Sequence, residues 1–137
     1  MPRLDPHPPE VLELVRRPGP GIRIAVVGAS NDPAKYGHII VENLKGKGFT
    51  VFPVNPRETT IAGLPAYGSV TTLPPPVHIV NVVTPPRVTL GVLGEVARAG
   101  LRNVWLQDGS YDQAVLDFCA GAPFRTVYEA CIMVVSG

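Results

Sequence analysis

The sequence has few cysteines and little net charge, and it lacks long apolar runs. Cys119 and Cys131 are its 2 cysteines, too few for a disulfide framework and spaced unlike any paired metal motif. A net charge of +1 provides no basic field for nucleic acid. No stretch approaches the roughly 18 apolar residues that span a membrane, and the opening MPRLDPHPPE lacks the apolar core of a secretory signal. These absences predict a reduced, cytoplasmic protein that binds neither nucleic acid nor membranes.

Several catalytic signatures are also missing. The sequence has no G-x-x-x-x-G-K-[ST] loop for triphosphates and no G-x-S-x-G nucleophile elbow. A phosphoacceptor receiver domain needs an Asp after its third strand, where this chain has Thr84. His7, His38 and His78 are too scattered to suggest a metal site. Because no acid–base or nucleophile–base pair stands out, we expect a protein without a metal and without catalysis of its own.

Size and composition favour one globular domain. A chain of 137 residues with 45% hydrophobic residues can build a single core. The 16 prolines, mostly in expected connections, and the excess of Arg over Lys fit a heat-adapted protein and a GC-rich genome equally well.

Apolar runs rich in β-branched residues alternate with segments of helical periodicity. Strands are predicted at 22–28, 49–54, 77–83, 102–106 and 124–128, and helices at 38–47, 87–99 and 112–120. This alternation predicts a doubly wound, mainly parallel five-stranded α/β sheet of Rossmann-like type. A minor turn or strand is expected around 61–67. The stretch EVLELVRRPGPG predicts an extra N-terminal helix, so we divide the chain into an extension at 1–21 and a domain at 22–137.

Ligands of open α/β sheets bind beyond the carboxyl ends of the strands. The first strand is followed by Gly28, Ala29 and Ser30, a turn that could present helix N–H groups to a phosphate, although Ser30 replaces the second glycine of the G-x-G-x-x-G motif. After the second strand, Arg57 takes the region where NAD enzymes present an acidic residue. Arg57 is therefore either a contact for the ribose phosphate of NADP or coenzyme A (CoA), or a solvated loop charge.

The two cysteines have different expected places. Cys119 falls on an apolar helix face and is expected in the core. Cys131 follows the last strand, where it is either a buried apolar residue or a thiol near the reactive end of a ligand.

Six short motifs occur at successive strand ends in the order typical of one family. They are VVGAS at 26–30, VFPVNP at 51–56, GLPAYGSV at 63–70, VVTPP at 82–86, WLQDG at 105–109 and the late Cys131. Over about 22–131 the chain resembles the single-domain CoA-binding proteins, which share a Rossmann-like fold with the N-terminal domain of the succinyl-CoA synthetase α-subunit and with ADP-forming acyl-CoA synthetases. The chain departs from the family pattern beside Cys131, where Ala130 and Ile132 replace the usual Asp and Pro.

The resemblance implies a CoA site made from the strand-end loops. The pyrophosphate would contact Gly28, Ala29 and Ser30, with Lys35 and Tyr36 flanking the phosphates. The ribose phosphate would contact Asn55, Pro56 and Arg57, with Tyr67 and Ser69 near the nucleotide. The adenine or pantetheine channel would be lined by Val83, Thr84, Pro85 and Pro86, and the pantetheine arm would be bordered by Gln107 and Gly109.

The leading hypothesis is a protein that binds CoA or an acyl-CoA as a carrier, sensor or subunit, in a homo-oligomer or beside a synthetase-like partner subunit. The alternatives are an NADP-linked reductase, a fragment of an acyl-CoA synthetase, and a docking module that has lost its ligand.

Overall fold

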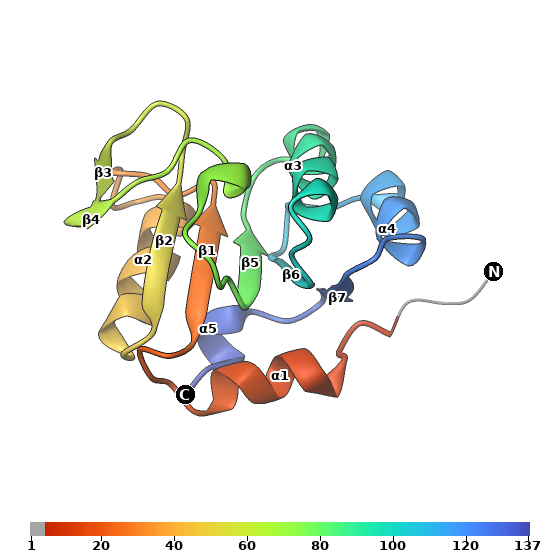
Figure 1. Cartoon of the computed structure of the whole chain (residues 1–137), viewed down its shortest axis with the longest axis horizontal. Coiled ribbons are helices and arrows are strands. Elements are labelled where there is room, and N and C mark those ends of the chain that lie inside the picture. The colour runs from red at the N-terminus through yellow and green to blue at the C-terminus, as the bar shows by residue number, and fades with distance from the viewer. Residues whose placement is uncertain (1–4) are drawn as a thin grey trace.

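The computed structural model describes residues 5–137. Its main strands are β1 (Arg23–Val27), β2 (Thr50–Val54), β5 (Ile79–Val82), β6 (Asn103–Leu106) and β7 (Arg125–Val127). Its helices are α1 (Pro9–Arg16), α2 (Tyr36–Gly46), α3 (Pro86–Arg98), α4 (Gln113–Ala120) and α5 (Ile132–Val135). The second and third main strands are joined by the short strands β3 (Thr60–Ile61) and β4 (Leu64–Pro65) and the 3₁₀ helix η1 (Val70–Thr72) (Figure 1).

The five main strands form one parallel sheet in the order β2-β1-β5-β6-β7. This confirms the predicted Rossmann-like α/β class. The chain moves outward from β1 to β2 and then returns to the other side of β1 at β5, so the strand order reverses between β1 and β5. A crevice forms at such a reversal because the two connecting segments leave the sheet on opposite faces.

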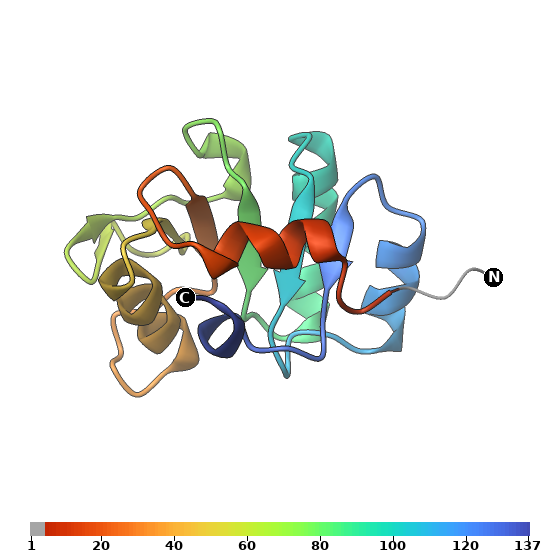
Figure 2. The same ribbon diagram turned by 90° about the horizontal axis from the view of Figure 1, so that it is seen from below.

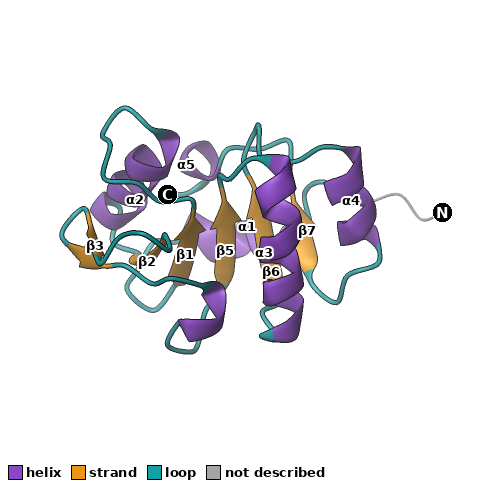
Figure 3. Ribbon diagram, turned by 90° about the horizontal axis from the view of Figure 1, so that it is seen from above, coloured by secondary structure: helices purple, strands orange, loops and turns teal. Residues whose placement is uncertain are grey.

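Alternate residues along each strand pack on opposite faces of the sheet. Ala25 and Val27 join a cluster under α3, α4 and η1, whereas Ile24 and Val26 join a cluster under α1, α2 and α5. Figure 3 shows α3 crossing the first face, and Figure 2 shows α1 crossing the second. Both faces are therefore covered, which explains why the strand sequences are almost continuously apolar.

The predicted N-terminal helix is present as α1, and it contributes to the core. Val11 and Val15 are fully buried against the sheet. The N–H of Gly137 donates to the carbonyl of Val15 at 2.9 Å, and the Lys47 ammonium donates to the carbonyls of Met133 and Ser136 at 2.6 and 3.0 Å. The C-terminal helix α5, which we did not predict, is thereby fixed beside α1 and α2. Whether 1–21 and 22–137 are separate units stays a prediction.

The irregular segment after β2 lies against the sheet edge. Tyr67 pairs with Val54 in a parallel bridge, and the Asn55 N–H donates to the Tyr67 carbonyl at 2.9 Å. Ser69 caps η1 by accepting the Thr71 N–H at 3.1 Å. The expected minor strand near 61–67 is confirmed as the β3–β4 hairpin. Within residues 5–137, no helix has the length and apolar character needed to cross a bilayer.

Candidate functional site

The turn after β1 and the start of α2 approach each other closely. Gly28 has φ +94°, a left-handed conformation that L side chains rarely adopt. A Cβ on Gly28 would lie 2.8 Å from Cγ2 of Val83, and a Cβ on Gly37 would overlap the Gly28 carbonyl. These two glycines bring the first turn of α2 against the backbone of the loop. Because α2 begins without a side-chain cap, its first N–H groups suit an anion.

Side chains fix the shape of this loop. The Asn55 amide donates to the Ala29 carbonyl at 2.9 Å, and its oxygen accepts the Arg57 N–H at 2.8 Å. The His38 ring nitrogen Nδ1 bonds the Ser30 carbonyl at 2.9 Å. Asn31 donates to the Glu58 carboxylate at 3.0 Å. The loops after β1 and β2 are therefore joined by hydrogen bonds within the protein.

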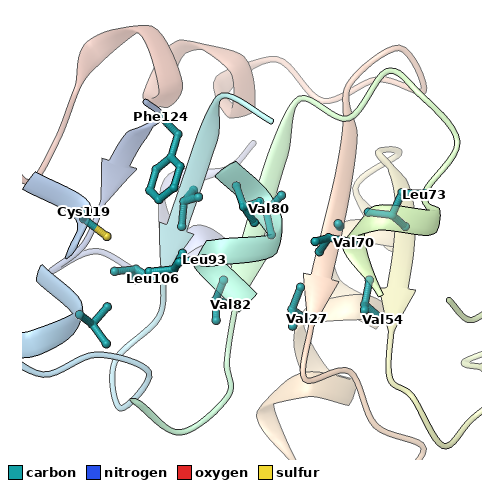
Figure 4. Packing of buried hydrophobic residues seen from close by; sticks show 14 of the residues in the cluster. Val27, Val54, Val70, Leu73, Val80, Val82, Leu93, Leu106, Cys119 and Phe124 are labelled. Atoms are coloured by element: carbon teal, nitrogen blue, oxygen red, sulfur yellow. The ribbon is translucent and has the colours of Figure 1, made fainter. Parts of the chain in front are cut away.

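A pocket of about 650 Å³, here called the larger pocket, opens beside the ends of β1 and β2. This volume lies within the roughly 300–1,000 Å³ of small-molecule sites. Val27, Val54 and Val70 form its apolar floor, and Figure 4 shows these three side chains beside one another. Two arginines and one carboxylate also line it: Arg57, Arg98 and Glu95.

A smaller pocket of about 310 Å³ opens by the end of β6. Gln107, only 6% exposed, forms its base and donates to the Sγ of Cys131 at 3.4 Å. The Gln107 oxygen accepts the Ile132 N–H at 2.9 Å and the Asn81 amide at 3.2 Å. Gln107 therefore fixes the segment that carries the Cys131 thiol against the strand ends.

The two cysteines differ in environment, as expected for Cys119. Cys119 is 2% exposed within the α3–α4 core, and burial raises the pKa of its thiol. Cys131 is partly exposed and lines the smaller pocket. Cys131 is therefore the thiol that a ligand in this pocket would approach.

Most of the predicted site residues lie at these two pockets. The larger pocket contacts Gly28, Asn55, Pro56, Arg57, Ser69 and Thr84. The smaller pocket contacts Tyr36, Val83, Pro85, Gln107, Gly109 and Cys131. Thr84 lines the larger pocket, and its neighbours Val83 and Pro85 line the smaller one. The chain segment that follows β5 therefore separates the two pockets.

Five predicted residues line neither pocket: Ala29, Ser30, Lys35, Tyr67 and Pro86. Ala29 is fully buried, and its carbonyl accepts the Asn55 amide, so it shapes the loop from inside. The Ser30 hydroxyl accepts the Asp32 N–H at 3.0 Å and so shapes the loop. The Tyr67 ring packs edge-on against Phe52, with centroids 5.7 Å apart.

The sequence reading missed one wall of the larger pocket. This wall is a stripe of α3 at helical spacing: Val88, Gly91, Val92, Glu95 and Arg98. The periodicity predicted the helix, but the interval of three or four residues does not tell which face remains open. Across residues 5–137, no group of three or more His, Cys, Asp or Glu residues is placed to hold a metal ion.

A family model and several known proteins are similar to this chain. A family model described as a CoA binding domain matches residues 23–137. The chain is 42% identical over 82 residues to the acetate–CoA ligase (ADP-forming) II subunit alpha of Pyrococcus furiosus, an alignment covering 59% of this chain but 18% of that subunit. It is 27% identical over 130 residues to the uncharacterized protein YneT of Bacillus subtilis, covering 95% of this chain and 94% of YneT.

A solved structure shares the fold at comparable identity. A conserved hypothetical protein from Pyrococcus furiosus superposes with a TM-score of 0.80 and 43% identity, over 82% of this chain and 97% of that one. With a matched family model and a shared three-dimensional framework, the chain belongs to the CoA-binding domain family.

Proposed function

We propose that the protein binds CoA or an acyl-CoA across the two pockets. The nucleotide half would occupy the larger pocket, and the pantetheine arm would cross the end of β5 toward Cys131 in the smaller pocket. The observation that carries this proposal is the arrangement itself: two pockets border Val83, Thr84 and Pro85, where strand order reverses. A long ligand with a bulky end for the larger pocket and a narrow arm for the smaller pocket fits this arrangement.

The charges support the same orientation. Arg57 lies at the rim of the larger pocket, and within residues 5–137 its guanidinium forms no ion pair. A free guanidinium suits the 3′-phosphate of CoA because it can donate two parallel hydrogen bonds. The uncapped start of α2 suits the pyrophosphate. Both features favour phosphorylated ligands over plain acyl chains.

We propose that this chain supplies binding, not chemistry. The Cys131 thiol has Gln107 as its hydrogen-bond partner, and an amide cannot act as the general base that an enzymatic nucleophile needs. The chain spans only 18% of the ligase subunit that it resembles, so the reaction of that protein does not transfer to this domain. A carrier, a sensor or the CoA-holding part of a larger assembly fits these observations.

The test is to identify what the purified protein carries and prefers. Protein denatured after gentle purification should release CoA or an acyl-CoA, detected by mass spectrometry. Added CoA should displace a fluorescent CoA analogue, whereas NADP, which also has a ribose phosphate but lacks the pantetheine arm, should compete poorly. Stronger competition by NADP than by CoA would support the reductase alternative. A lack of binding by either ligand would contradict the proposal.

A further inference from the structure

The larger pocket contains a carboxylate that the fold does not use. Glu95 is half-buried in the middle of α3 and lines the pocket. No described residue forms an ion pair or a side-chain hydrogen bond with it. A ligand that covered this carboxylate would cost free energy unless a donor on the ligand met it. A ligand that fills the larger pocket should therefore present a hydrogen-bond donor to Glu95.

The nearby Arg98 does not form an ion pair with Glu95. Arg98 lies three residues after Glu95, a spacing that allows helical ion pairs. Its guanidinium instead lies over Gly94, where Nη1 is 3.4 Å from the position of an ideal Cβ, and the two charges form no ion pair. Arg98 is itself exposed. Glu95 thus lines the pocket without an ion pair to its own helix.

The surroundings of Glu95 suit a flat aromatic ring. Val54 and Val70 line the floor of the same pocket, and Val92 lies one turn before Glu95 on α3. Gly91, which also lines the pocket, leaves this part of the helix surface bare, because a Cβ there would have no atom within 4 Å. Glycine inside a helix costs roughly 1 kcal/mol relative to alanine. The bare backbone and the valines together form an apolar slot that ends in one acceptor.

Building on the proposed function, we infer that Glu95 is a specificity-determining residue that accepts a hydrogen bond from the 6-amino group of the adenine of CoA. Adenine has a flat apolar face for the valine-lined slot, and its exocyclic amine is a donor. The ligand would run from the phosphates at Gly28 past the ribose at Arg57 to the base beside α3. Among the residues that line the larger pocket, Glu95 has the one carboxylate.

The test compares CoA with an analogue whose base is unsubstituted purine, with hydrogen in place of the amino group. Calorimetric titration of the wild-type protein should give roughly tenfold tighter binding of CoA than of the analogue. Glu95→Ala should remove this preference by weakening CoA while leaving the analogue unchanged. Glu95→Gln should retain most of the preference for CoA, since the amide oxygen of glutamine also accepts a hydrogen bond. Glu42→Ala, which removes an exposed carboxylate from α2, is the matched control and should behave as wild type.

The outcomes separate this inference from the proposed function. Tight CoA binding with equal affinity for the purine analogue, or a preference that persists in Glu95→Ala, would overturn the role of Glu95 and leave CoA binding intact. Failure of the wild-type protein to bind either ligand would overturn both. Thermal unfolding of each variant provides the check on folding, and alanine is a good helix former at this position.

Discussion

Gly37 lies so close to Gly28 that a single methyl group on the helix would collide with the carbonyl of the loop. The atoms nearest to that methyl group are backbone: besides the carbonyl oxygen, the Gly28 carbonyl carbon would be 2.9 Å away and the Ala29 Cα 3.0 Å away. A collision with backbone cannot be relieved by a rotamer change. The loop shape that we assign to the phosphates therefore depends on this pair of glycines.

We predict that Gly37→Ala lowers the free energy of unfolding by about 1–3 kcal/mol, since overpacking forces the backbone to move. Gly46→Ala, at the other end of α2, is the control because a Cβ there would have no atom within 4 Å. It should leave stability unchanged or raise it. Urea denaturation of both variants measures the difference. Equal behaviour of the two would contradict the close approach.

Gly91→Leu should change stability and binding in opposite directions. The substitution adds a good helix former where α3 has open space, so the free energy of unfolding should rise by about 0.5–1 kcal/mol. The leucine would extend into the larger pocket and weaken CoA binding. Denaturation and calorimetry on the same sample test both. A stabilised variant that binds CoA as well as wild type would show that the ligand does not lie along α3.

Arg57→Ala tests the contact with the ribose phosphate. We predict a loss of about 1.5–3 kcal/mol in CoA binding, the usual range for a hydrogen bond to a charged group, and a much smaller loss for dephospho-CoA. Arg102 is exposed and precedes the N-terminal end of β6, away from the strand ends that form the pockets. Arg102→Ala therefore controls for the loss of one positive charge. If both ligands lose the same affinity, Arg57 does not contact that phosphate.

Alkylation should distinguish the two cysteines. Iodoacetamide should modify Cys131, which lines the smaller pocket, well before Cys119, whose thiol is buried and has a raised pKa. Saturating CoA should slow the modification of Cys131 without affecting Cys119. Mass spectrometry of peptides gives both rates. A Cys131 rate that CoA leaves unchanged would place the pantetheine arm elsewhere.

Burial of Cys119 also predicts an alkaline loss of stability. Its pKa is higher in the folded chain than in the unfolded one, so the folded state retains a proton that the unfolded state releases. The free energy of unfolding should therefore fall as pH rises above the ordinary thiol pKa. Cys119→Val, which keeps the site apolar, should flatten this part of the curve. Denaturation over the alkaline range measures it, and an unchanged slope in the variant would exclude Cys119 as the cause.

The sequence was informative where periodicity and burial agree. The apolar β-branched runs predicted all five main strands because each is buried on both faces. Asp112 was expected at or near the start of a helix, and its side chain accepts the Val115 N–H at 3.0 Å. The four residues of α5 could not be predicted, since IMVV has the composition of a strand. Its helical form accompanies long-range contacts from Lys47 and α1.

In the candidate site, too, local sequence patterns predicted some features, whereas others depend on long-range packing. Strand-end loops could be located from the chain order, which brought Gly28, Asn55 and Gln107 to one edge. The open face of α3 could not be located, because it depends on how η1 packs and on the missing side chain of Gly91. Tyr67 was expected near the nucleotide, and this stays a prediction. Its ring packs on Phe52, a contact between segments that local patterns do not reveal.

Calorimetric titration of the purified protein with CoA tests the central claim most directly. We predict a saturable heat with one CoA per chain, weakened by removal of the 3′-phosphate and reduced further when pantetheine alone is titrated. No heat at CoA concentrations well above the micromolar range, or equal binding of pantetheine and CoA, would contradict a site divided between the two pockets.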